Sequence, residues 1–167
     1  MTNEEFNRIL KNLKKNDLAA LEDIYNEYFQ KLKFTALCIV RDNNDAYDIA
    51  MNVILKLVDI PIYDDSIKNH VGFLITITRN ESINFIKKKN RSLQFDGDFD
   101  RYANRISDNL WIKDILEELT EDEKDVFIEH CIWGIRLKVI AKKQGKSYAT
   151  VVRTYSSIKD KIKQLYS

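Results

Sequence analysis

The chain has 167 residues, of which 44% are hydrophobic and 32% are charged, a composition typical of a globular protein rather than a disordered one. One proline and four glycines make repeated β-hairpins and a glycine-rich nucleotide loop unexpected. The two histidines and two cysteines lack the spacing of a zinc site, and no apolar run is long enough to cross a membrane. Cys38 and Cys131 lie in apolar runs, so we expect buried, reduced thiols. We therefore predict an all-α, cytoplasmic protein without a metal, a cofactor or a membrane partner.

The net charge of +1 hides a segregation of charge along the chain. Residues 1–92 carry 14 basic and 13 acidic side chains, and residues 93–110 carry 2 and 4. Residues 111–129 carry 2 basic and 8 acidic side chains, whereas residues 130–167 carry 9 and 1. A second basic cluster occupies residues 87–91. Two separated basic clusters indicate two contacts with one extended polyanion, although ordinary solvated lysines would give the same pattern.

Four helices are predicted in residues 1–92, which we interpret as one helical domain. A short helix follows Thr2, a longer one begins near the capping residue Asp17, and two more cover residues 45–59 and about 70–90. The apolar stripe of the longer helix is Leu21, Ile24, Tyr25, Tyr28, Leu32, Ala36 and Ile39. The acidic stretch 93–110 lacks a helical apolar period and is predicted to be a linker.

Residues 111–167 are predicted to form a second domain of four short helices. Thr120 and Glu123 match a capping box that opens the second of these helices, and Ser147 is suited to cap the fourth. The fold class is therefore all-α, with two small helical domains joined by an acidic linker.

The last two helices of this second domain carry the sharpest motif. Ala141, Gly145 and Val151 have the spacing of a helix-turn-helix, which needs a small residue at the crossing, a left-handed glycine and an apolar residue facing the first helix. The opposite face of the last helix is small and polar with one arginine, which suits a helix in a DNA major groove: Ala149, Thr150, Arg153 and Ser156. Lysines that flank this face could reach phosphates: Lys142, Lys143 and Lys146. A plain helical hairpin is the alternative, but the spacing together with the local charge favours DNA binding.

The face of the 45–59 helix that lies opposite its apolar stripe is polar except for two residues. Met51 and Leu55 lie one turn apart between Asp48, Asn52 and Lys56. Such a pair suggests contact with a groove or a partner helix, although single exposed apolar residues are common.

One side of the 70–90 helix combines ring, amide and ammonium groups. Its members recur at three- and four-residue steps: Phe73, Ile77, Asn80, Asn84, Lys87 and Lys88. Rings stack on bases, amides read base edges and ammonium groups hold phosphates, so this side suits single-stranded DNA. A core helix with a solvated basic end is the alternative.

The order and separation of these pieces resemble a bacterial RNA polymerase sigma factor of the extracytoplasmic-function group. The similarity spans about residues 17–90 and 111–165, and it is carried by residues 21–28, 45–50, 72–80 and 119–127 and by the helix-turn-helix. The resemblance implies that residues 1–92 form a region 2-like domain and residues 111–167 a region 4-like domain.

The resemblance also implies a role for each face. Four residues would dock on the clamp helices of the largest polymerase subunit: Asp48, Met51, Asn52 and Leu55. Six would capture flipped non-template bases of the minus-10 promoter element: Phe73, Ile77, Asn80, Asn84, Lys87 and Lys88. Six would contact the minus-35 element: Lys146, Ser147, Ala149, Thr150, Arg153 and Ser156.

The partners that follow from the resemblance are core RNA polymerase, promoter DNA and an anti-sigma factor. The chain departs from the family at Met51 and Asn52, where Gln-Glu is usual, and at Ile54 and Val58, where aromatic residues are usual. Two rival interpretations are a helix-turn-helix regulator that does not open promoters and a helical adaptor that does not bind DNA. No nucleophile–base pair or metal-ligand spacing is present, so an enzyme is not expected.

Overall fold

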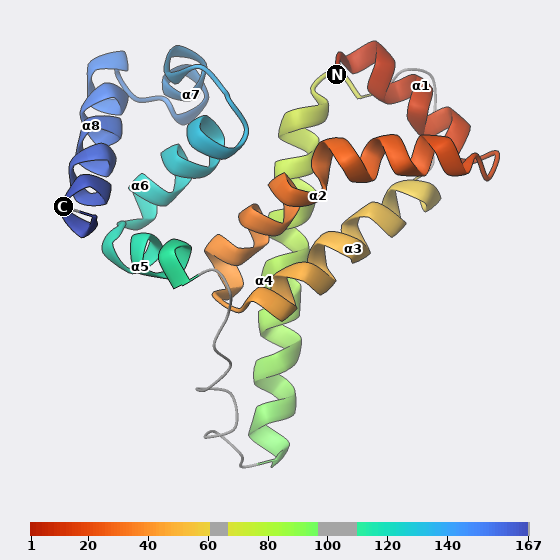
Figure 1. Cartoon of the computed structure of the whole chain (residues 1–167), viewed down its shortest axis with the longest axis horizontal. Coiled ribbons are helices and arrows are strands. Elements are labelled where there is room, and N and C mark those ends of the chain that lie inside the picture. Colours follow the sequence, from red (N-terminus) through yellow and green to blue (C-terminus); the bar gives the residue numbers. More distant parts are fainter. Residues whose placement is uncertain (61–66, 97–109, 167) are drawn as a thin grey trace. The chain divides into compact units, whose positions relative to one another are not determined.

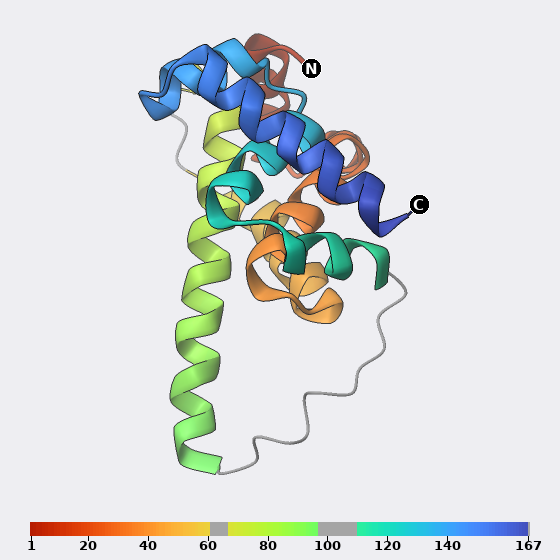
Figure 2. The ribbon, with the colours of Figure 1, turned by 90° about the vertical axis from the view of Figure 1, so that its left-hand side faces the viewer.

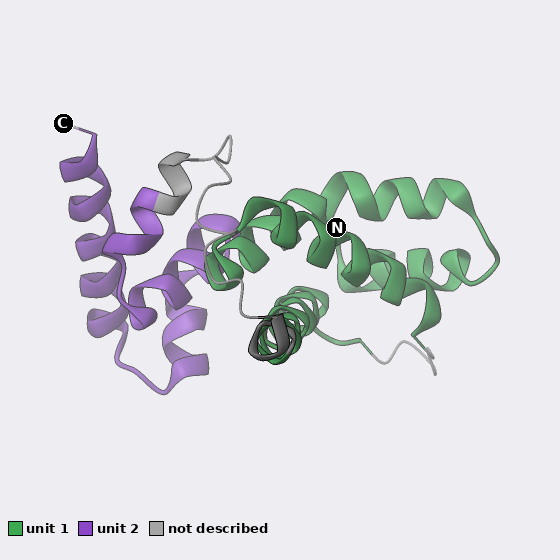
Figure 3. Ribbon diagram, turned by 90° about the horizontal axis from the view of Figure 1, so that it is seen from below, with its two compact units in different colours: residues 1–103 green, residues 104–167 purple. Residues whose placement is uncertain are grey.

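The computed structural model describes residues 1–60, 67–96 and 110–166, and all regular secondary structure in these ranges is helical. The chain divides into two compact units, residues 1–103 and 104–167 (Figure 3). Most of the predicted linker, residues 97–109, lies outside the described residues. In none of the described helices is a stretch both long and apolar enough to cross a membrane.

The first unit contains α1 (Asn3–Leu13), α2 (Leu18–Val40), α3 (Asn43–Asp59) and α4 (His70–Asp96) (Figure 1). Side chains supply the N-caps of the first three helices. The hydroxyl of Thr2 accepts from the N–H of Glu5 at 3.2 Å, and the Asp17 carboxylate accepts from the N–H of Ala19 at 3.0 Å. Arg41 ends α2 in the left-handed region at φ +57°, so the chain turns directly into α3.

The longest helix of the first unit is α4, which passes the predicted end near residue 90 and continues to Asp96 (Figure 2). It therefore enters the segment predicted to be linker. Leu74, Ile75, Thr78 and Ser82 are buried on one side of it. The two hydroxyls are satisfied within the helix, because that of Thr78 donates to the Leu74 carbonyl at 2.7 Å and that of Ser82 donates to the Thr78 carbonyl at 2.8 Å.

The core of the first unit forms where α2 packs against α1, α3 and α4. Its largest fully buried side chains include Phe6, Leu10, Ile24, Tyr28, Leu32, Ile49, Ile54, Leu57, Leu74 and Ile75. The prediction that Tyr25 lies in this core is wrong, because Tyr25 is 38% exposed and its neighbour Phe29 is buried. Contacts on several sides of α2 widen its buried face to Phe29, and the Tyr25 ring stacks over the Phe29 ring at 4.6 Å.

The second unit contains α5 (Leu110–Glu118), α6 (Glu121–Val126), the π-helix η2 (Phe127–Ile132), α7 (Leu137–Gln144) and α8 (Tyr148–Leu165). The predicted capping box of Thr120 and Glu123 is present. The hydrophobic core of the second unit includes these buried residues: Ile115, Leu119, Val126, Ile140, Ala141, Val151 and Ile158.

The π-helical turn changes which residues face the core of the second unit. Ile128 and Trp133 are buried, whereas Cys131 is exposed. The prediction of a buried thiol is therefore confirmed for Cys38 and wrong for Cys131. A π-turn holds more residues than an α-turn and so turns the residues within it to other sides of the helix, which an apolar run in the sequence does not reveal.

A buried carboxylate joins α6 to α8. Glu123 is 6% exposed and accepts hydrogen bonds from the hydroxyl of Ser157 at 2.7 Å and from Nζ of Lys161 at 2.7 Å. Burial on its own raises the pKa of Glu123, but hydrogen bonds from Lys161, Ser157 and Thr120 outweigh it and lower the pKa to about 2. The carboxylate therefore stabilises the unit only while it is ionised.

We expect the free energy of unfolding of the second unit to fall as the pH is lowered from about 5 to 2, because Glu123 binds a proton more readily in the unfolded chain. The loss due to this carboxylate should be on the order of 2 kcal/mol. Trp111 and Trp133 both belong to this unit, so tryptophan fluorescence during denaturation reports its unfolding.

The matched variants for this measurement are Glu123→Gln and the exposed Glu117→Gln. Glu123→Gln should unfold more easily at pH 7 and show a flatter pH dependence, whereas Glu117→Gln should behave like the wild type. An unchanged pH dependence in Glu123→Gln would contradict this assignment.

Candidate nucleic-acid interface

The crossing of α7 and α8 has the geometry that the sequence spacing predicted. Ala141 and Val151 are buried in the core between the two helices. Gly145 ends α7 in the left-handed region at φ +64°, a conformation that glycine adopts without strain. The hydroxyl of Ser147 accepts from the N–H of Thr150 at 3.1 Å and caps α8. A tight turn with a capped second helix therefore presents the start of α8 to solvent.

The solvent side of α8, which we call the α8 face, consists of Ala149, Thr150, Arg153 and Ser156, all exposed. Tyr155 lies on the other side, where it is partly buried against the core and its ring meets the His130 ring edge-on at 4.7 Å. The separation of small polar residues from core residues on this helix follows the prediction.

Two of the lysines predicted to flank the α8 face are held by acidic residues. Nζ of Lys143 lies 2.8 Å from the buried carboxylate of Glu129, and Nζ of Lys146 lies 2.9 Å from the carboxylate of Asp122. The charges of −6 on residues 111–129 and +8 on residues 130–167 belong to the same unit and leave it with only +2. Charge segregation along the sequence therefore overstates the positive charge of the folded surface.

The polar side of α3, the α3 face, has Asp48, Asn52 and Leu55 exposed and Met51 half-buried. Leu55 is 54% exposed, and Tyr47, one turn before Met51, is 44% exposed. An apolar ridge at four-residue spacing is therefore formed by Tyr47, Met51 and Leu55. The sequence analysis missed Tyr47, although the same four-residue spacing could have shown that it belongs to this face.

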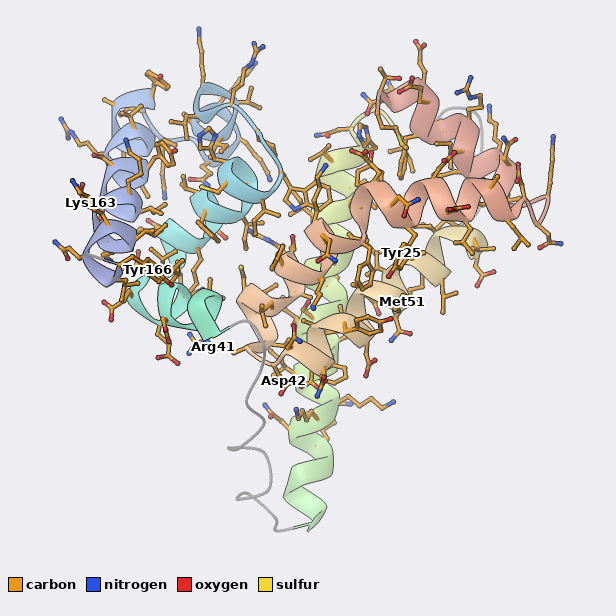
Figure 4. All side chains as sticks on the ribbon, in the orientation of Figure 1. Tyr25, Arg41, Asp42, Met51, Lys163 and Tyr166 are labelled. Atoms are coloured by element: carbon orange, nitrogen blue, oxygen red, sulfur yellow. The ribbon has the colours of Figure 1, made fainter. Side chains whose placement is uncertain are left out.

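An aromatic cluster extends the α3 face onto α2. The Phe29 ring contacts two tyrosine rings. Its centroid lies 4.6 Å from that of Tyr25 and 5.2 Å from that of Tyr47. Figure 4 shows Tyr25 on α2 and Met51 on the neighbouring α3. The surface around the α3 face is therefore wider than the four residues predicted from the sequence.

The candidate DNA-contacting side of α4, the α4 face, lies opposite its buried side. Its exposed members are Asn80, Asn84, Lys87 and Lys88, and its half-buried members are Phe73 and Ile77. Ile83, 44% exposed and one turn from both Asn80 and Lys87, belongs to this face as well and was missed. Apolar, amide and cationic groups thus share one helix surface, as the pattern predicted.

Two ion pairs join α4 to α3. Nζ of Lys56 lies 2.6 Å from the Glu81 carboxylate, and Nζ of Lys89 lies 2.6 Å from the Asp45 carboxylate. Lys89 is therefore directed to α3, while its neighbours Lys87 and Lys88 stay on the exposed face. The three- and four-residue steps in the sequence had already placed Lys87 and Lys88, but not Lys89, on this face.

The residues that lead into α4 are held by α1. Asn3 donates from its amide to the Lys68 carbonyl at 2.7 Å and accepts from the N–H of His70 at 3.0 Å. Asn7 donates to the Ile67 carbonyl at 3.1 Å. The Phe6 ring stacks on the His70 ring at 5.1 Å, and burial lowers the pKa of His70, which favours the neutral imidazole. The start of α4 is thus anchored by side chains from the other end of the unit's sequence.

Among the described residues, no group of three or more His, Cys, Asp or Glu side chains could hold a metal ion. No protein-family model matches the sequence, and a search of curated proteins gives no match either. What the chain does must therefore follow from its own surfaces.

We expect Asn3→Ala to loosen the first turn of α4, because it removes one hydrogen bond to each of two backbone groups. A loss of about 1–2 kcal/mol corresponds to roughly a five- to thirty-fold faster amide exchange over residues 70–76. Mass-spectrometric hydrogen exchange measures this, with the exposed Asn26→Ala as the control. Asn3→Asp should fall between the two, since it keeps only the acceptor for the His70 N–H. Equal exchange in Asn3→Ala and Asn26→Ala would refute the anchoring role.

We expect Asp122→Asn to strengthen binding of the protein to duplex DNA by about two- to five-fold, because it frees Lys146 from an exposed ion pair of about 0.5–1 kcal/mol. Fluorescence anisotropy of a labelled duplex at low salt measures the change. Asp160→Asn removes the same charge from an exposed position on α8 and is the matched control. Equal gains in both variants would show that net charge, and not the release of Lys146, is responsible.

Proposed function

We propose that this protein is an RNA polymerase sigma factor of the extracytoplasmic-function group, which binds core polymerase, recognises promoter DNA and performs no chemistry itself. The observation that carries the proposal is the exposure of three distinct helix faces, on α3, α4 and α8, each backed by a well-packed core. Rigid helices are suited to hold recognition residues in fixed positions.

The α3 face supports docking on the clamp helices of polymerase. A helix partner binds best to an apolar ridge with a polar rim, and Tyr47, Met51 and Leu55 supply the ridge while Asp48 and Asn52 supply the rim. The departures at Ile54 and Val58 lie on the inner side of α3, where Ile54 is buried and Val58 is half-buried. They change the core beneath this face rather than the exposed ridge.

The α4 face supports capture of the minus-10 element as a single strand. Extruding a base costs a few kcal/mol, and stacking on a ring returns about 1–3 kcal/mol per base. Phe73 and Ile77 offer apolar surface, Asn80 and Asn84 offer amides for base edges, and the following lysines can hold phosphates. Binding energy from the other two faces would supply the remainder.

The α8 face supports recognition of the minus-35 element in the major groove, with Lys146 and Ser147 at the start of the helix. The small net charge predicts weak binding of the free protein to duplex DNA. Promoter recognition would therefore require that the protein is first bound to core polymerase. Both proteins would meet in the cytoplasm. An anti-sigma factor that covered any of these faces would keep the protein inactive.

The test is transcription by purified core polymerase from a low-GC bacterium on genomic DNA fragments, with and without this protein. We expect discrete new start sites, and we expect Met51→Asp and Leu55→Asp to abolish them, because a carboxylate would be buried in the docking contact. Leu18→Asp is the control, since Leu18 is 79% exposed and an acidic residue in the first turn of α2 is favourable.

Other outcomes would favour the rival functions. Salt-sensitive duplex binding that Arg153→Ala removes, without any new transcript, would identify a helix-turn-helix regulator that does not open promoters. Neither transcripts nor DNA binding would identify a helical adaptor.

A further inference from the structure

The lysines of the second unit differ in whether the fold gives them a carboxylate partner. Three of them, from α7, α8 and the turn between these helices, pair with acidic residues of α6 and η2: Lys143, Lys146 and Lys161. A cation that is already paired gains less from a new anion than one that faces only water. The pairing therefore selects which lysines of this unit are available to a ligand.

Two lysines of α7 are not paired in this way. Lys138 and Lys142 are exposed, and neither makes an ion pair with a described residue. They lie four residues apart, so their side chains leave the same side of the helix about 6 Å apart along its axis. We call this pair of lysines the α7 face. The sequence analysis named Lys142 but not Lys138.

The neighbours of α7 do not neutralise this face. The helix itself contains no acidic residue, and it packs mainly against η2 and α8. These two elements are described throughout and contain one acidic residue each: Glu129, which Lys143 already holds, and Asp160, more than three turns from the start of α8. Helix α5, which follows the undescribed residues 97–109, packs against α8 at the opposite end of the unit (Figures 1 and 2).

The α7 face adjoins the start of the α8 face. The N–H of Gly145 donates to the Lys142 carbonyl at 3.4 Å, and Ser147 caps α8 two residues later. Lys142 therefore belongs to the turn of α7 that leads into α8, and Lys138 lies one turn farther away. When the second helix of a helix-turn-helix enters the major groove, the first helix crosses the phosphate backbone beside that groove.

We propose that the α7 face binds two phosphates of one strand of duplex DNA, beside the groove that the α8 face reads. The inference rests on the proposed function, since it needs duplex DNA at the α8 face. It adds Lys138 to the DNA contacts and leaves Lys143, on the same helix, with the structural role of pairing Glu129. A lysine suits this task because its ammonium group acts as a point charge on a long flexible stem.

An acidic protein surface would be attracted by the same two lysines, but the position of the α7 face favours DNA. The α8 face has one cation, Arg153, and is otherwise small and uncharged, so it supplies little attraction to the phosphate backbone. Phosphate contacts set the register of a base-reading helix on the duplex. The α7 face supplies such contacts next to a helix that has few of its own.

The experiment measures how salt affects the binding of holoenzyme to a labelled duplex with the minus-35 element of a promoter found by transcription, between about 50 and 200 mM salt. Lys138→Gln/Lys142→Gln removes both cations of the α7 face. Lys14→Gln/Lys15→Gln removes two exposed cations from the first unit and is the control for net charge. Lys138→Arg/Lys142→Arg keeps the charge and should bind like the wild type. Fluorescence-monitored denaturation checks that every variant is folded.

We expect Lys138→Gln/Lys142→Gln to lower the slope of log affinity against log salt by about 1.8, because each phosphate contact on duplex DNA contributes about 0.9. Phosphates carry no sequence information, so affinity for the minus-35 duplex and for a scrambled duplex should fall by the same factor, several-fold at low salt. Equal slopes in this variant and in the Lys14/Lys15 control would overturn the inference and leave the proposed function intact.

Two further outcomes separate the inference from the proposed function. Unchanged DNA binding together with lost transcription would overturn the inference and assign the α7 face to an acidic protein partner. If the wild type gives no transcripts but binds duplex DNA by itself, the proposed function fails, and the same comparison of slopes on the free protein decides the inference. If the wild type binds no duplex DNA in either form, both fail.

Discussion

The first unit depends on the burial of one side of α4 against its neighbours. Leu74 and Ile75 pack into the core, and the Thr78 and Ser82 hydroxyls can be buried there because they donate to carbonyls of their own helix. The Lys56–Glu81 and Lys89–Asp45 ion pairs then favour one rotation of α4 on α3. Once this rotation is set, the amides and the remaining lysines face solvent, so the exposed face follows from packing.

The second unit meets a different constraint, because its acidic and basic segments fold together. Glu123, Glu129 and Asp122 each contact a lysine from α7, α8 or the turn between them. These contacts join the helices but withdraw positive charge from the surface. The α8 face itself is small and polar, and with these lysines paired its surroundings are less basic than the sequence suggests. This composition is better suited to reading base edges than to strong nonspecific attraction.

Local chemistry made most of the fold predictable from the sequence. Asp17, Thr120 with Glu123, Gly145 and Ser147 mark helix ends by interactions within a few residues, and all of them act as expected. What the sequence did not reveal depends on partners far along the chain or on unusual geometry: the exposure of Tyr25, the π-turn that exposes Cys131, and the acidic partners of Lys143 and Lys146. The three candidate faces were predictable because each lies on the side of its helix opposite the periodic apolar residues.

The hydrogen bonds of Asn3 and Asn7 span 60 to 67 residues of sequence, and this has a consequence for the order of folding. During synthesis α1 leaves the ribosome before its partners at residues 67–70, which emerge several seconds later at about 5–20 residues per second. Until then its apolar side, with Phe6 and Leu10, lacks the cover that His70 provides in the folded unit. Helix α1 is thus made before α2, α3 and α4, yet it completes its contacts only when the start of α4 has been made.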